Sequence, residues 1–76
     1  MEDFIRKFTE QFIDADDLKI EEETNFRDID SYDSLTGMAI IMMIEDNYGV
    51  TISEKEFKKF NTPEELFEYI KKISKE

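Results

Sequence analysis

Apolar residues recur at spacings of three and four in two segments, one near each end of the chain. From about Glu2 to Asp14 the apolar positions are Phe4, Ile5, Phe8, Phe12 and Ile13. In the last segment they are Leu66, Phe67, Tyr69, Ile70 and Ile73. This spacing places them on one face of a helix. Both segments are therefore predicted to be amphipathic helices, the last with lysines in its final turns.

Two sequence patterns typical of helix starts lie in the last third of the chain. Ser53 and Glu56 form a Ser-x-x-Glu capping pattern, which predicts a short third helix that buries Phe57 and Phe60. The same pattern recurs as Thr-Pro-x-Glu from Thr62, with proline in the first turn. The last helix is therefore expected to begin there.

The middle of the chain divides into a loop and a helix. The stretch from Ala15 to Tyr32 is rich in Asp and Glu and carries isolated apolar residues without a sustained period, which predicts a long loop pinned to the core. Such length in a compact domain indicates a functional reason. Asp33 can cap a second helix from Ser34 to about residue 47, and Gly49 can end it in a left-handed conformation.

The second helix has two apolar stripes. One contains Gly37, Ile40, Ile41, Ile44 and Tyr48, and the other contains Leu35, Met38, Ala39 and Met42. A peripheral helix buries only one stripe, which leaves an apolar patch framed by Ser34, Glu45 and Asp46, a composition typical of a docking surface. The alternative is a central helix that buries both stripes, and it stays open above all for Met43 and Ala39.

These elements predict an all-α fold, a four-helix bundle with a long loop between the first two helices and a short third helix. The run Val50-Thr51-Ile52 is too short to make a sheet and has no partner. With 76 residues and one proline, residues 1–76 are expected to form one domain with modest stability.

Composition excludes several classes of function. The chain has no cysteine and no histidine, which excludes disulfides, thiolate or imidazole metal sites, and nucleophilic triads built on either residue. Its net charge of −10 disfavours nucleic acid and anionic lipid and favours partners with basic patches. The N-terminal residues lack a signal-peptide pattern and no apolar run could span a membrane. We therefore expect a cytoplasmic monomer without enzymatic activity.

Ser34 is the candidate site residue. A serine at a helix start is more often a cap, but a group on this hydroxyl would lie at the positive end of the second helix, which favours a phosphodiester. No Cys, His or suitably placed Lys can activate the hydroxyl, so another protein would have to modify it.

The segment from Phe26 through Asp33-Ser34-Leu35 to Val50 resembles the central motif of acyl carrier proteins, in which Asp-Ser-Leu opens helix two. The resemblance covers nearly the whole chain. It includes the Ile-Glu-Asp-x-Tyr-Gly-Val ending of the second helix and the Thr-Pro start of the last. The resemblance implies a carrier whose Ser34 receives 4'-phosphopantetheine from coenzyme A through a phosphopantetheinyl transferase.

Further roles follow from the same resemblance. Asp33 matches the acidic residue before the modified serine. Docking positions for acyl-loading and acyl-transfer enzymes correspond to Leu35, Met38, Met42, Glu45 and Asp46. The implied function is delivery of acyl groups, held as thioesters, in fatty-acid, polyketide or related biosynthesis.

Departures from the motif of fatty-acid carriers indicate which kind of carrier the chain resembles. Fatty-acid carriers commonly have a glycine and a small or apolar residue before Asp-Ser, and acids where this chain has Thr36 and Ala39. This chain has Ser31-Tyr32 before Asp-Ser, and the aromatic Tyr32 in front of Asp-Ser-Leu is similar to specialised stand-alone carriers that serve individual biosynthetic pathways. Peptidyl and D-alanyl carriers share the architecture, so an aminoacyl cargo stays open.

Two other classes of function are compatible with a small acidic chain at first sight, an adapter and a calcium-binding protein. An acidic helical adapter, or a decayed carrier, would bind partners without receiving the arm. Calcium binding finds no support, because neither acidic cluster fits an EF-hand loop: counted from Asp14 the fifth position is Leu18, and counted from Asp28 it is Tyr32.

Overall fold

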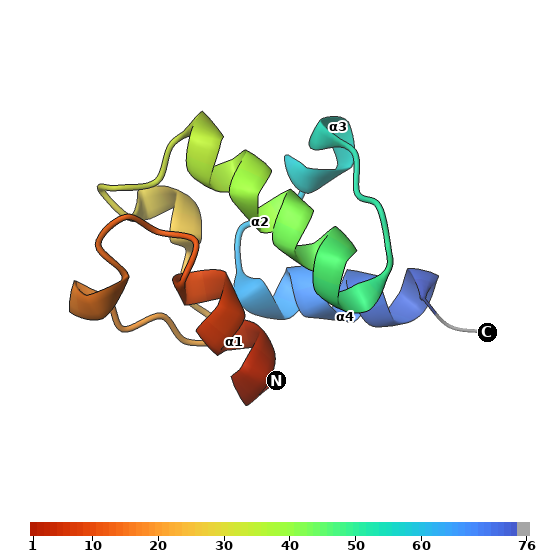
Figure 1. Ribbon diagram of the computed structural model, residues 1–76, viewed down its shortest axis with the longest axis horizontal. Coiled ribbons are helices and arrows are strands. Elements are labelled where there is room, and N and C mark those ends of the chain that lie inside the picture. Colours follow the sequence, from red (N-terminus) through yellow and green to blue (C-terminus); the bar gives the residue numbers. More distant parts are fainter. Residues whose placement is uncertain (75–76) are drawn as a thin grey trace.

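The computed structural model describes residues 1–74 and consists of four α-helices and two short 3-10 turns (Figure 1). The elements are α1 Glu2–Thr9, η1 Ala15–Asp17, η2 Phe26–Asp28, α2 Ser34–Tyr48, α3 Glu54–Phe57 and α4 Pro63–Ile73. Residues 1–74 contain no strand. The prediction of an all-α fold with a long first connection and a short third helix is confirmed.

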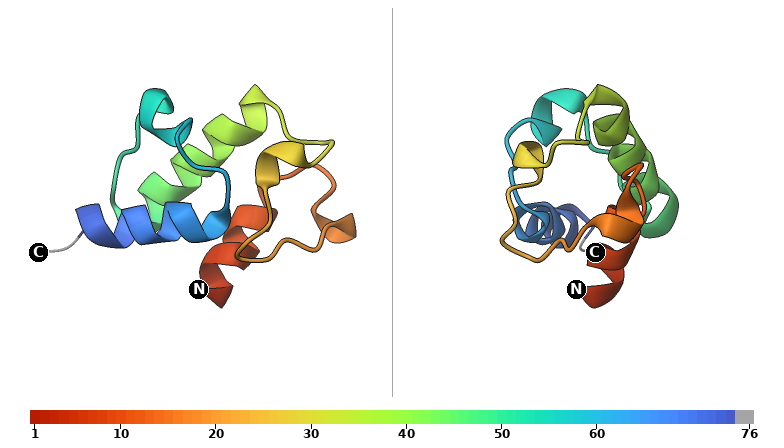
Figure 2. Two further views of the ribbon diagram at one scale, coloured as in Figure 1. Left: turned by 180° about the vertical axis from the view of Figure 1, so that it is seen from behind. Right: turned by 90° about the vertical axis from the view of Figure 1, so that its left-hand side faces the viewer.

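The helices enclose one core, with α2 crossing the molecule obliquely and α4 lying along one side (Figures 1 and 2). Helix α1 contacts both α2 and α4, and α3 contacts α2. Consequently the two ends of α2 lie in different surroundings. Its first turn is next to the long loop, and its last turn is next to α1 and α4.

Aromatic rings make up much of the core. Its buried members are Phe4, Phe8, Phe12, Ile20, Phe26, Ile40, Met43, Ile44, Ile52, Phe57, Leu66 and Ile70. The Phe4 ring of α1 lies 5.2 Å from the Phe67 ring of α4, which joins the two ends of the chain. Phe57 is buried as predicted, whereas Phe60 is only half-buried. The Phe60 ring packs at the edge of the core against Tyr69, which is itself half-buried, with ring centroids 5.0 Å apart.

The first helix is shorter than the sequence pattern predicts, since it ends at Thr9 instead of Asp14. After Thr9 the backbone tightens to i→i+3 hydrogen bonds, such as that from the Phe12 amide to the Thr9 carbonyl at 3.0 Å. Phe12 still reaches the core, but the change of period turns Ile13 outward. Ile13, predicted on the apolar face, is 93% exposed.

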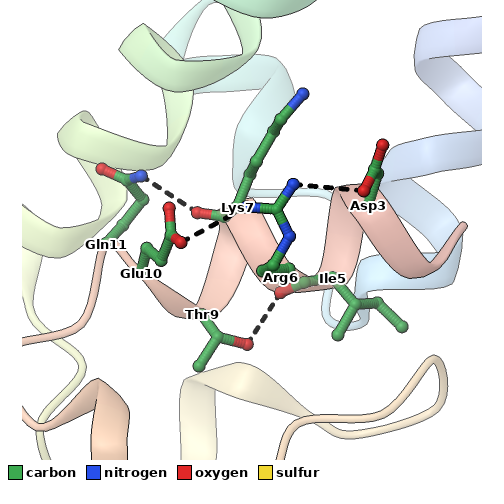
Figure 3. A network of polar contacts seen from close by, with 7 residues as sticks. All are labelled: Asp3, Ile5, Arg6, Lys7, Thr9, Glu10 and Gln11. Carbon is green, nitrogen blue, oxygen red and sulfur yellow. Dashed lines mark hydrogen bonds and ion pairs between the residues drawn. The ribbon is translucent and has the colours of Figure 1, made fainter.

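Polar contacts run along the exposed side of α1 (Figure 3). The Arg6 guanidinium lies 3.1 Å from the Asp3 carboxylate and 3.5 Å from that of Glu10. Exposed pairs like these contribute little to stability. Beyond the helix end, the side-chain amide of Gln11 donates to the backbone carbonyl of Lys7 at 3.0 Å and so satisfies a carbonyl of the last turn.

The long loop is pinned to the core as predicted. Ile20 and Phe26 are buried. The Phe26 amide donates to the carbonyl of residue 61 at 3.0 Å, and the Glu64 amide donates to the Glu22 carbonyl at 3.0 Å. Both bonds attach the loop to the start of α4, and this fixes the loop that leads into α2.

Side-chain caps begin α3 and α4 where they were predicted. Ser53 accepts a hydrogen bond from the Glu56 amide at 3.1 Å, and Thr62 accepts one from the Glu65 amide at 3.1 Å. In a full capping box the glutamate also accepts a hydrogen bond from the backbone amide of the cap residue. The Glu56 carboxylate does not, and accepts from the Tyr69 hydroxyl at 2.6 Å. The Glu65 carboxylate accepts instead from the amide that precedes the Thr62 cap, at 2.7 Å.

Candidate functional site

Ser34 is the first residue of α2 and is exposed. Asp33 has an extended backbone and caps the helix, as predicted. Its carboxylate accepts from the Thr36 amide at 2.9 Å and from the Thr36 hydroxyl at 3.0 Å. The capping function therefore belongs to Asp33, and the Ser34 hydroxyl is left available for another use.

The hydrogen bonds at this helix start set the charge of Asp33. The bond from the Thr36 amide, followed by that from the Thr36 hydroxyl, lowers the pKa of the Asp33 carboxyl below its ordinary value. The carboxylate is thus ionised at neutral pH. It lies at the positive end of the α2 dipole, the end at which a helix also stabilises a phosphodiester.

The far end of α2 matches its prediction. Gly49 follows the helix with φ of 71°, and its amide donates to the Glu45 carbonyl at 3.0 Å. A left-handed residue at this position favours glycine because a side chain would be strained. The helix thereby spans 15 residues, from Ser34 to Tyr48.

A groove of about 320 Å³ lies beside Ser34, between α2 and α3. Its apolar lining comes from Met38, Ile41 and Phe57, and the exposed Lys58 also lines it. Because Ser34 itself lines the groove, a group attached to the hydroxyl would begin at its mouth.

Arg27 also lines this groove, and sequence reasoning gave it no role. Its guanidinium donates to the carbonyls of Phe57 at 2.6 Å and Phe60 at 2.9 Å, at the end of α3. It also lies over three aromatic rings, with the Phe26 centroid 5.0 Å away. A cation at a helix C-terminus is favourable. The only sequence signal was an arginine within an acidic, aromatic-rich segment, and that does not reveal which carbonyls it binds.

Gly37 brings α2 close to the loop. A Cβ atom at this position would lie 2.7 Å from the Tyr32 hydroxyl and 3.3 Å from the Phe57 ring. The Tyr32 hydroxyl in turn accepts from Arg27 at 3.3 Å. The glycine therefore allows Tyr32 to pack directly against the first turns of α2, just below Ser34.

The two stripes of α2 differ in burial. Ile40 and Ile44 are fully buried, while Leu35, Met38 and Met42 are 75%, 48% and 60% exposed. Glu45 and Asp46 are exposed as well. Of the two residues left open, Met43 is buried and Ala39 is half-buried. The central-helix alternative is wrong for the outer stripe, and the exposed patch next to Ser34 is present in the structure.

A family model of the phosphopantetheine attachment site matches residues 3–70. The chain belongs to this family. Members carry 4'-phosphopantetheine as a covalent cofactor and act as carriers, and they interact with transferases and biosynthetic enzymes. No solved structure matches the chain significantly.

The residues present fit the cofactor of this carrier family. The exposed Ser34 hydroxyl lies at the positive end of α2, which favours a phosphodiester, and beside a groove of about 320 Å³. Residues 1–74 contain no group of three or more acidic side chains placed to hold a metal ion. None of the helices described has the length and hydropathy needed to cross a membrane.

Proposed function

We propose that Ser34 is the attachment residue and that the protein is a non-catalytic carrier of acyl or aminoacyl thioesters for biosynthetic enzymes. When bound, the arm supplies a terminal thiol that forms the thioester. One observation supports this assignment most directly: an exposed serine begins a helix that another residue, Asp33, already caps.

The modification itself requires only the hydroxyl of Ser34 from this chain. The Ser34 oxygen forms a bond to the phosphorus on the pantetheine side of coenzyme A, and the bond from that phosphorus to adenosine 3',5'-bisphosphate breaks. The hydroxyl proton passes to a base of the transferase or to water. The α2 dipole stabilises the resulting phosphodiester.

We propose Leu35, Met38 and Met42 as the apolar centre of the surface on which partner enzymes dock, with Glu45 and Asp46 meeting basic residues of those enzymes. Their exposure and their position along α2 from Ser34 support this role. Fatty-acid, polyketide or related biosynthesis in the cytoplasm is the proposed setting, and a monomer is the proposed state.

The experiment is the intact mass of the protein after incubation with coenzyme A, magnesium and a broad-specificity phosphopantetheinyl transferase. We expect a gain of one phosphopantetheine, and no gain for Ser34→Ala. Ser53→Ala is a matched control, because Ser53 is also an exposed serine at a helix start. Absence of any gain in the wild-type protein would contradict the carrier assignment and favour the acidic adapter.

A further inference from the structure

Ile13 is the most exposed of the large apolar residues, at 93%, although the sequence pattern predicts it in the core. Its position is fixed on both sides. Phe12 is 2% exposed and packs against the Phe8 ring, with centroids 5.7 Å apart. Asp14 accepts a hydrogen bond from the Ser31 hydroxyl at 2.6 Å. Because both neighbours of Ile13 are fixed by these contacts, the Ile13 side chain is kept exposed to solvent.

The anchors also place Ile13 close to the attachment site. Ile13 lines a shallow depression together with Asp33 and Leu35, the two residues that flank Ser34 in the sequence. Figures 1 and 2 show the segment after α1 and the segment that enters α2 at the same end of the molecule. The depression therefore joins an apolar residue of the loop to the two sequence neighbours of Ser34, while Ser34 itself lines the groove between α2 and α3.

We propose that Ile13 and Leu35 form a two-part apolar docking surface for the phosphopantetheinyl transferase, an inference that rests on Ser34 being the attachment residue. The transferase meets a protein without an arm, so it has to bring its active site to the Ser34 hydroxyl itself. The surface next to Ser34, including the depression lined by Ile13 and Leu35, is then covered. An enzyme that receives a thioester reaches its substrate through the arm and can dock farther along α2.

The charges around this surface indicate what kind of site on the transferase would be complementary to it. Asp14, Asp16 and Asp17 follow Ile13, and Asp33 adjoins it. The apolar pair thus has Asp33 beside it and the exposed Asp16 and Asp17 a few residues farther along the loop. It fits a transferase that presents an apolar pocket bordered by Lys or Arg beside its active site.

The test is the initial rate of arm transfer from coenzyme A at increasing concentrations of the protein, with the same broad-specificity transferase. We expect Ile13→Ser to raise KM about fivefold with little change in kcat, the effect of losing a well-packed interface side chain. Ile13→Val keeps an apolar β-branched side chain, so its KM should stay near that of the wild type.

Ile73→Ser is the matched control. Ile73 is also an exposed isoleucine, at 40%, but it lies in the last turn of α4 at the opposite end of the molecule (Figure 1). Melting temperatures report whether Ile13→Ser folds normally. An unchanged KM for Ile13→Ser, or an equal rise for Ile73→Ser, would overturn the proposal. Lack of modification in the wild type would overturn the carrier function and this inference with it.

Discussion

The inner and outer faces of α2 are both apolar but differ in what covers them. On the inner face Ile40 and Ile44 pack in the core, whereas on the outer face Leu35 and Met42 are mostly exposed to solvent. The side chains differ as well. Ile40 and Ile44, β-branched residues with few rotamers, pack inside together with Met43, whereas the flexible Met38 and Met42 lie on the surface proposed for docking. Apolar character therefore serves stability on the inner face, and on the outer face it serves the docking role that we propose.

The largest effect is expected when one residue on each face of α2 is replaced by alanine and the losses of stability are compared. Ile40→Ala should lower the free energy of unfolding by about 2–5 kcal/mol, because a fully buried side chain leaves a cavity. Met42→Ala should change it by less than about 0.5 kcal/mol, since Met42 is 60% exposed. Urea denaturation measures both values. Ile40→Val gives an intermediate step of about 0.5–1.5 kcal/mol for a variant that still folds. Equal losses on the two faces would refute the assignment of inner and outer sides.

The inner face also has a steric test near Ser34. Gly37→Ala gains about 1 kcal/mol in helix propensity but places a Cβ 2.7 Å from the Tyr32 hydroxyl, a conflict of about 1–3 kcal/mol. We expect a net loss of about 1 kcal/mol in the free energy of unfolding. In the Tyr32→Phe background the loss should shrink, with the Phe57 ring at 3.3 Å as the remaining limit. A cost that is the same in both backgrounds would contradict this account.

The sequence predicts the helix starts of this fold better than its first helix end. Asp33, Ser53 and Thr62 cap helices through side-chain hydrogen bonds to an amide three residues later, a local interaction that a short motif encodes. The end of α1 depends on packing of Phe12 against other elements, and periodicity alone cannot register the switch to i→i+3 bonds. Hence Ile13 was misplaced.

The candidate site likewise combines features that local sequence predicts with contacts that depend on the tertiary fold. Ser34 and the outer stripe follow from a motif and a helical period, both of which are properties of neighbouring residues. Arg27 binds the Phe57 and Phe60 carbonyls, 30 and 33 residues away. Contacts of that separation are created by the tertiary fold, so their partners could not be read from the chain.

The proposed docking role of the outer face can be tested by enzyme kinetics through the two acidic residues near the C-terminal end of α2. Reversing Glu45 and Asp46 to lysine should raise the KM of an acyl-transfer enzyme for the modified protein several-fold at low ionic strength and much less near 1 M salt, where the Debye length is about 3 Å. Glu21→Lys with Glu23→Lys is the matched control, because it makes the same change in net charge at two exposed loop positions. If the control pair has the same effect, overall charge and not the α2 surface attracts the enzyme.

The smallest effect is expected where the two faces of α2 begin, at the Asp33 cap. Hydrogen bonds from Thr36 lower the pKa of Asp33 in the folded protein, so the stability they supply is complete above the unfolded value of about 4 and is lost as pH falls through the folded pKa. Asp33→Asn keeps an oxygen that can accept from Thr36 but has no charge to titrate. The melting temperature of the wild type should exceed that of Asp33→Asn at pH 7, and the gap should close as pH falls below about 4. Asp30→Asn, at an exposed acid outside the helix, controls for the loss of one negative charge. A gap independent of pH would mean that the cap acts through shape alone, and the ionised carboxylate would then contribute nothing to holding Ser34 at the start of α2.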